Sequence, residues 1–208
     1  MNGRTEVSRM LGGSMVAMLC VGSLGGATTA AADAKRWVLD PAASEVSFDV
    51  GATGHDVHGT VAVGSGEILF DSTNGSASGE IVVGAATAQT GNGKRDATLR
   101  NDVFEVLRYP EIRFVARRFT GELPISGSGD VTLEGSLVLL GKEHPLSLPT
   151  HVTVSGPRVS AETVFTVPFL DWGLHDPSVF FLRVSNLVAI KVKTMGTLTG
   201  VPAGEPSR

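Results

Sequence analysis

Two histidines three positions apart, His55 and His58, with Asp56 between them, are the side chains of this sequence best suited to bind a metal ion. Imidazole and carboxylate groups are common ligands of zinc and other transition metals. On a β-strand, positions three apart point to opposite faces, so the imidazoles converge only if Gly54 and Gly59 place them in a turn. We therefore expect a solvated loop here and no metal site.

The remaining histidines, His144, His151 and His175, stand alone in the sequence. A histidine acts as a base only when neighbouring groups orient it and tune its pKa, and no such context is visible around these three. The chain also lacks the G-x-S-x-G, H-E-x-x-H and Walker phosphate-loop motifs. The sequence predicts a protein that is not an enzyme and that needs no cofactor.

Residues 1–32 have the pattern of a secretory signal peptide. Arg4 and Arg9 give a positive start, Met10–Leu24 is apolar, and small residues offer cleavage sites near Ala32 or Ala34. The apolar part is shorter than the ~20 residues that span a bilayer. We expect export to the periplasm or secretion.

Cys20, the only cysteine, lies inside this leader and follows Leu19 rather than a small residue, which disfavours lipid attachment. Cleavage would leave no thiol, which excludes disulfides, cysteine nucleophiles and thiolate metal sites. Removing the leader takes the formal charge from −4 to −5, and no Lys/Arg cluster is present, so nucleic acid is not an expected partner. We expect one domain, residues 33–199, followed by a disordered tail, residues 200–208.

Alternation of apolar and polar residues dominates the rest of the chain and predicts β-strands. It is clearest in residues 46–50, 68–70, 112–116, 131–133, 165–169 and 188–192. Turn signals separate these runs at Asn74-Gly75, Gly91–Gly93, Gly127–Gly129, Gly141–Glu143 and Ser155–Pro157. Strands with one apolar face and no intervening helices imply a closed barrel or a sandwich, and periodicity alone does not choose between them.

Two segments depart from the β pattern. After Gly91–Gly93, residues up to Tyr109-Pro110 have mixed helical spacing, and Asp96 and Arg100 lie four apart, which suits a helical ion pair. The second segment, residues 169–182, is apolar and aromatic but aperiodic. It forms either a loop over a barrel mouth, where Trp172, Phe180 and Phe181 would contact a ligand, or a plug that closes the core.

The order of several short motifs resembles the YceI-like family of bacterial periplasmic polyisoprenoid-binding proteins. The residues that carry the resemblance are Trp37, Asp40, Pro41, Ser44, Val46, Phe48, Val50, Gly59, Ile68–Asp71, Val131–Gly135, Pro145 and Leu146. The resemblance covers Arg36 to Leu198. It departs from the family at Thr98, where many relatives carry His, and near Gly51, where many carry a basic residue.

The resemblance implies an all-β fold, an extended antiparallel β-barrel of about eight strands that is lipocalin-like, with a short helical insert. It also implies a non-catalytic protein that binds or carries an isoprenoid lipid, of the quinone or polyprenyl type, in a hydrophobic channel. The side chains then expected at the ligand are Val46, Phe48, Val50, Ile68, Phe70, Ile112, Phe114, Leu133, Phe165, Val167, Phe169, Trp172, Val188 and Ile190. Asn92, Lys94, Arg95 and Asp96 are candidates to meet a polar head.

Two other hypotheses stand beside this one. The chain could form a secreted β-sandwich interaction module with a solid core and no lipid, or an enzyme that depends on His55 and His58. For the carrier, transient contact with a membrane or membrane protein is expected, as a monomer or homodimer. Eight strands give an interior either packed with side chains or wide enough for one slim ligand, and the sequence does not decide which.

Overall fold

The computed structural model describes residues 34–54, 56–177 and 184–200. The predicted signal peptide, His55, Phe180, Phe181 and the tail after Gly200 lie outside the described residues. Gly200 itself, which we expected to begin the tail, is the last residue of a strand.

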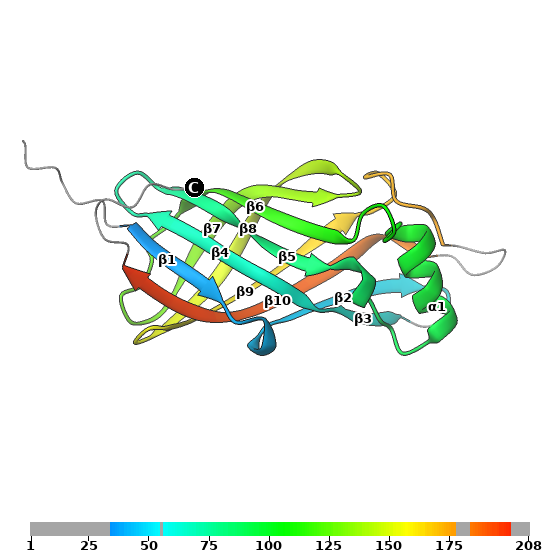
Figure 1. The fold of residues 1–208 in the computed structure, drawn as a ribbon, viewed down its shortest axis with the longest axis horizontal. Helices are drawn as coiled ribbons and strands as arrows, with labels where there is room; N and C mark the ends of the chain where they lie inside the picture. Colours follow the sequence, from blue (N-terminus) through cyan, green and yellow to red (C-terminus); the bar gives the residue numbers. More distant parts are fainter. Residues whose placement is uncertain (1–33, 55, 178–183, 201–208) are drawn as a thin grey trace, which may run out of the picture. The chain divides into compact units, whose positions relative to one another are not determined.

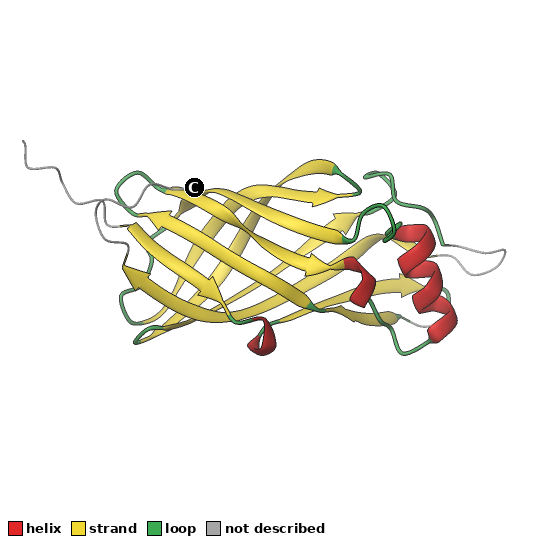
Figure 2. Cartoon of the chain, viewed as in Figure 1, coloured by secondary structure: helices red, strands yellow, loops and turns green. Residues whose placement is uncertain are grey.

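The described chain folds as an antiparallel β-barrel (Figures 1 and 2). Its strands are β1 (Ala34–Leu39), β2 (Glu45–Ala52), β3 (Val57–Val61), β4 (Val63–Asp71), β5 (Ser76–Gly84), β6 (Glu111–Thr120), β7 (Gly127–Leu139), β8 (Lys142–Ser155), β9 (Arg158–Pro168) and β10 (Val184–Gly200). Short 3-10 turns span Pro41–Ala43 and Ala85–Thr87, and helix α1 (Gly93–Thr98) continues into a π-helical turn, Leu99–Val103. No described helix has the length and apolar character that a membrane span requires.

Strand β10 closes the barrel. One edge pairs with β9, and the other pairs with β2 along its first part and with β1 along its last part. On the far side of these two strands, β3 pairs with β2 and β4 pairs with β1, so β3 and β4 also act as one strand. The ten segments therefore act as eight barrel strands, and the predicted fold is confirmed.

The corner between β1 and β2 is made by the Asp40-Pro41 and Ser44 motif. The Asp40 carboxylate accepts a hydrogen bond from the Ala42 N–H at 3.1 Å, and Pro41 suits the first position of the 3-10 turn. The Ser44 hydroxyl accepts from the Met195 N–H at 3.1 Å, and the Asp40 N–H donates to the Met195 carbonyl at 2.7 Å. These bonds keep the chain attached to β10 while it changes direction.

The helical insert, residues 85–103, lies at one end of the barrel (Figure 1). It is attached to the free edge of β3, where Thr60 and Gln89 exchange two backbone hydrogen bonds of 2.9 and 3.0 Å. The helix ends at Val103, earlier than the Tyr109-Pro110 stop that we predicted. The cause is Glu105, whose φ of 47° is left-handed and cannot continue a helix.

Two predicted turns are also placed differently. Gly127–Gly129 is the start of β7, where these glycines pair with residues 152–154 of β8. The β7–β8 turn consists of Leu140 and Gly141, with φ of 50° and 72°, and residues 142 and 143 already belong to β8. Two positive φ angles match the twist of a two-residue hairpin, so the register tolerates the strain at Leu140.

Strands β8 and β9 are paired over only part of their length, from Thr150–Thr163 to Ser155–Arg158. The Thr163 hydroxyl donates to the Pro149 carbonyl at 2.7 Å, so the backbone polar groups of Pro149 face β9. By the two-residue period of a strand, those of Pro145 face the same way. Proline has no N–H to donate, so this edge of β8 cannot form a full ladder. We call the unpaired edges, residues 142–149 and 164–168, the β8–β9 seam.

The half of the barrel away from the insert is filled by side chains. Ile68 is 0% exposed, and the Phe70 and Phe119 rings meet edge to face with centroids 5.4 Å apart. Val152, Val154 and other buried residues of the same cluster complete this packed core. A close-packed interior loses stability when even one methylene is removed.

We predict that Ile68→Val lowers the free energy of unfolding by about 0.5–1.5 kcal/mol, because it removes a buried methylene from this core. The matched control is Ile125→Val, the same substitution at a side chain that is 89% exposed, where we expect a change within about 0.5 kcal/mol. Urea unfolding measures both. Equal effects of the two substitutions would contradict a packed core at this end.

Candidate functional site

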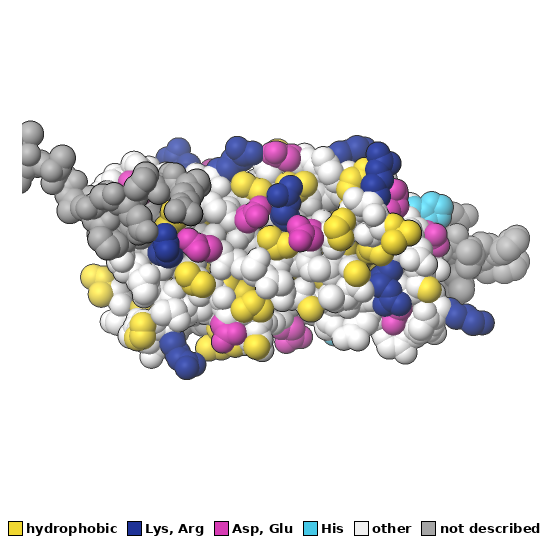
Figure 3. Space-filling view, in the orientation of Figure 1, with side chains coloured by type: hydrophobic (Ala, Val, Ile, Leu, Met, Phe, Trp, Pro, Cys, Tyr) yellow, Lys and Arg dark blue, Asp and Glu magenta, His cyan; other side chains and the backbone are white. Residues whose placement is uncertain are grey.

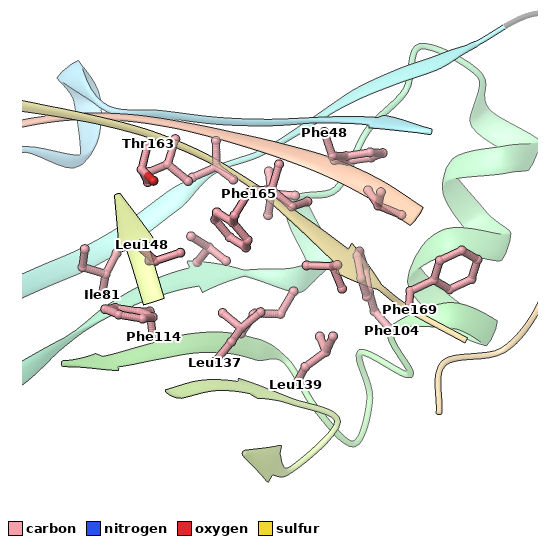
Figure 4. A pocket seen from close by; sticks show the side chains of 18 of the residues that line it. Phe48, Ile81, Phe104, Phe114, Leu137, Leu139, Leu148, Thr163, Phe165 and Phe169 are labelled. Atoms are coloured by element: carbon pink, nitrogen blue, oxygen red, sulfur yellow. The ribbon is translucent and has the colours of Figure 1, made fainter. Parts of the chain in front are cut away.

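The half of the barrel nearer the insert encloses a cavity of about 250 Å3 (Figure 4). One buried water needs only about 10–15 Å3. Leu137 and Phe165 point into this space and remain partly exposed, whereas Ile68 in the packed half is fully buried. The sequence left open whether the interior is a channel or a core; the structure has a cavity in one half and a core in the other.

All but three of the described residues that line the cavity are apolar. The exceptions are Thr150, Thr163 and Thr194, and each hydroxyl donates to a strand carbonyl, at 2.9 Å to Leu148, 2.7 Å to Pro149 and 3.1 Å to Ala161. Their hydrogens are therefore already used within the barrel wall. The cavity offers a surface for hydrocarbon and very little for a polar group.

Eleven of the fourteen residues predicted to meet a ligand line this cavity: Val46, Phe48, Val50, Ile112, Phe114, Leu133, Phe165, Val167, Phe169, Val188 and Ile190. They come from β2, β6, β7, β9, β10 and the residue after β9, so alternation assigned them to the correct face. Their contact with a ligand stays a prediction.

The other three, Ile68, Phe70 and Trp172, are not among the lining residues. Ile68 and Phe70 face inward but belong to the packed core, because the pairing of β4 with β1 places them toward the far end. Trp172 belongs to the loop that follows β9, and its ring stacks on that of His144. Leu174 of that loop does line the cavity.

Sequence reasoning missed several lining residues. Ile81, Leu137, Leu139 and Leu148 continue the period-two pattern of β5, β7 and β8, so extending the alternation would have found them. Leu99, Val103 and Phe104 reach the cavity from the insert. Their helical spacing was visible, but nothing local says that the insert covers the end of a barrel.

Phe48 shows how a large ring is kept against the wall. Its neighbour across the β2–β3 pair is Gly59, and a Cβ on Gly59 would collide with the Phe48 ring. Glycine here lets the ring lie across the adjacent strand. The ring therefore lines the cavity without filling it.

The polar residues of the insert hold its own backbone. Asn92 caps α1 by accepting from the Lys94 and Arg95 N–H groups at 3.1 and 3.2 Å. Asp96 is buried and accepts from the Thr90 N–H and hydroxyl at 2.7 and 2.6 Å. The Thr90 hydroxyl bond is the largest cause that lowers the pKa of Asp96.

The sequence spacing predicted an ion pair between Arg100 and Asp96. The Arg100 guanidinium donates its hydrogen bond to the Ala88 carbonyl instead, at 3.0 Å, while its charge contributes to lowering the pKa of Asp96. The Arg95 guanidinium donates to the Thr90 hydroxyl and carbonyl at 2.7 and 3.0 Å. Of the head-group candidates Asn92, Lys94, Arg95 and Asp96, none lines the cavity. Asn92, Arg95 and Asp96 stabilise the local conformation of the insert through these hydrogen bonds.

Two of the exposed histidines, His58 and His151, pair with carboxylates on the outer face. His58 lies opposite Asp49, with Nδ1 and Oδ1 2.6 Å apart, and His151 lies opposite Asp130 at 2.7 Å. His55, the partner in the metal hypothesis, is outside the described residues. Within the described part of the chain, no cluster of three His, Cys, Asp or Glu side chains could hold a metal ion.

His144 is the histidine with a buried environment. Its ring stacks on Trp172, with centroids 4.1 Å apart and planes 8° from parallel, and its Nε2 is buried without a hydrogen-bond partner. Burial lowers the pKa of His144, and the nearby Lys142 lowers it further. A neutral imidazole therefore holds the loop after β9 against β8, next to the β8–β9 seam.

The visible outer surface carries acidic and basic side chains mixed together, with scattered apolar groups (Figure 3). Ion pairs between exposed side chains of different strands include Arg117–Glu143 at 2.7 Å and Lys193–Glu162 at 3.6 Å. Exposed pairs of this kind contribute little to stability.

An eight-stranded antiparallel barrel with an apolar internal cavity defines the lipocalin-like class of barrel. The sequence profile of the YceI-like domain matches residues 37–195. The chain belongs to the YceI-like family, and the resemblance seen in its motifs is confirmed.

Two solved structures share this fold. A polyisoprenoid-binding domain from Saccharophagus degradans, implicated in plant cell wall breakdown, superposes with a TM-score of 0.63 at 16% identity, over 78% of this chain and 98% of that one. Burkholderia cenocepacia BcnA superposes with a TM-score of 0.61 at 18% identity, over 76% and 98%. No curated protein sequence gives a significant match.

The partly buried His144 predicts a pH dependence of stability. Because its native pKa is below the ordinary value of about 6.5, the unfolded chain takes up the proton first, and the unfolding free energy falls as pH drops below about 6.5. We expect His144→Gln to reduce this fall between about pH 7 and pH 5. Urea unfolding across that range measures it.

The matched control is His175→Gln, which removes an exposed histidine from the loop that carries Trp172. It should leave the pH dependence of the wild-type protein in place. A pH dependence that is the same in all three proteins would contradict a buried neutral His144.

Proposed function

We propose that this protein binds and carries an isoprenoid lipid, of the quinone or polyprenyl type, without catalysing a reaction. The observation that carries the proposal is that one half of the barrel interior is not filled by side chains. It contains a cavity of about 250 Å3 that is lined almost entirely by apolar side chains. Membership of the YceI-like family supports it, as does the similarity in fold to the polyisoprenoid-binding domain from Saccharophagus degradans.

The energetics favour a hydrocarbon chain as the occupant. Burial stabilises by about 0.8 kcal/mol per methylene, so a dozen carbons contribute on the order of 10 kcal/mol before the cost of immobilising the ligand. The three threonine hydroxyls of the lining already donate to the wall and have no hydrogen left for a ligand oxygen deep in the cavity. The chain therefore enters first and the polar head stays toward the insert end.

The two alternative hypotheses have less support. The solid-core sandwich module requires two open sheets, whereas β10 closes this sheet into a barrel. The histidine-dependent enzyme requires converging imidazoles, but His58 and His151 are on the outer face, paired with Asp49 and Asp130. His144 is stacked on Trp172 outside the cavity lining.

The cellular setting belongs to the same proposal. A signal-peptide pattern over residues 1–32 fits a periplasmic or secreted carrier. A lipid that is nearly insoluble in water has to be collected from and returned to a membrane or a membrane protein. Transient contact with one of these follows, for a monomer or a homodimer.

The decisive experiment is native mass spectrometry of protein exported to the periplasm and purified without detergent, followed by organic extraction. We expect a bound mass that extracts as an isoprenoid. A clean apo mass, together with no uptake of supplied quinones or polyprenols, would overturn the proposal. A fluorescent apolar probe displaced by the supplied lipid gives the affinity.

We predict that Phe165→Asp abolishes lipid retention, because it places a charge on the cavity wall, where it has no partner. Thr166→Asp is the matched control, since the next residue on β9 faces the solvent. Leu137→Trp is a second variant that fills the cavity without adding a charge. Thermal melting checks that each variant is folded, and unchanged retention in folded Phe165→Asp and Leu137→Trp would remove the cavity as the binding site.

A further inference from the structure

The cavity ends at one level around the barrel. Going from the insert toward the packed half, the last lining residues on β5 to β10 are Ile81, Phe114, Leu133, Thr150, Ala161 and Thr194. The next inward side chains along β6 to β9 belong to the packed core instead: Ala116, Val131, Val152 and Val159. A boundary that all these strands share is a floor, below which a chain cannot pass without displacing core side chains.

Trp37 is the largest side chain at this level. It lines the cavity and is also part of the packed core, and its backbone partners Ile68 and Leu198 lie outside the lining. Its indole lies over Gly196, where a Cβ would come within 2.5 Å of Nε1. That Nε1 is buried with no hydrogen-bond partner, so packing rather than a polar contact fixes the ring.

The depth of the cavity follows from strand geometry. From Leu139 to Leu133 on β7 is about 20 Å of strand, and from Phe169 to Ala161 is about 26 Å, at ~3.3 Å per residue. With a strand tilt of about 40°, these lengths correspond to about 15–20 Å along the barrel axis. An extended hydrocarbon with bonds of about 1.5 Å advances about 1.25 Å per carbon, so about 12–16 carbons reach the floor.

We infer that Trp37 is the residue that sets the length of apolar chain this protein holds, at about 12–16 chain carbons, or three to four isoprene units. This inference rests on the proposed function and adds the size of the ligand to it. A longer isoprenoid fills the cavity with one end and leaves the remainder outside the barrel. Affinity then depends on chain length up to the floor and not beyond it.

The test is a series of linear primary alcohols of about 8 to 22 carbons, measured by displacement of a fluorescent apolar probe from the full-length exported protein. With the wild type, affinity should rise about fourfold per methylene and then level off at about 12–16 carbons. In Trp37→Leu, a shorter apolar side chain lowers the floor, and the levelling point should move to longer chains. In Ala161→Leu, a larger side chain at floor level should move it to shorter ones.

Ala189→Leu is the matched control, because Ala189 lies on β10 between the inward-facing Val188 and Ile190 and is not part of the lining. It should keep the wild-type levelling point. If Trp37→Leu does not fold, the Ala161→Leu shift still decides. If the levelling point is the same in the wild type and in every folded variant, the inference is overturned while the carrier function stands. If neither an alcohol nor an isoprenoid displaces the probe from the wild type, both are overturned.

Discussion

Closure of the sheet by β10 is the constraint on which the rest of this protein depends. One strand of 17 residues pairs with β9 on one edge and with both β1 and β2 on the other, and the Asp40–Ser44 corner stays hydrogen-bonded to Met195 where the chain passes from β1 to β2. A closed barrel has one inside, and every inward side chain contributes to a single compartment. Without the corner, β1 and β2 would not continue one another beside β10, and the barrel would have a gap with exposed strand edges.

The interior is then divided into two halves by the size of the inward side chains and by their position along the barrel axis. Ile68, Phe70 and Phe119 fill one half, whereas glycines such as Gly59 let a ring like that of Phe48 lie along the wall of the other. The protein thus places its stabilising core and its candidate binding site end to end in the same barrel.

Much of the fold could be predicted from sequence because the two-residue period of a strand fixes which face each residue is on. That is why Phe165, Val167 and Ile190 were assigned correctly to the inner face. The same period says nothing of height along the axis, which depends on the register between strands, so Ile68 was predicted at the ligand although it lies in the packed core. The end of the insert depended on one backbone angle, at Glu105, which composition does not reveal.

The β8–β9 seam has a mechanical consequence. Where neighbouring strands are paired, they separate only by breaking a ladder of backbone hydrogen bonds, so the girth of the barrel is fixed there. Between residues 142–149 and 164–168 no such ladder exists, and the contact there is the stack of the His144 ring on Trp172. Because Pro145 and Pro149 leave these edges without a full ladder, β8 and β9 can move apart along the β8–β9 seam without loss of strand pairing.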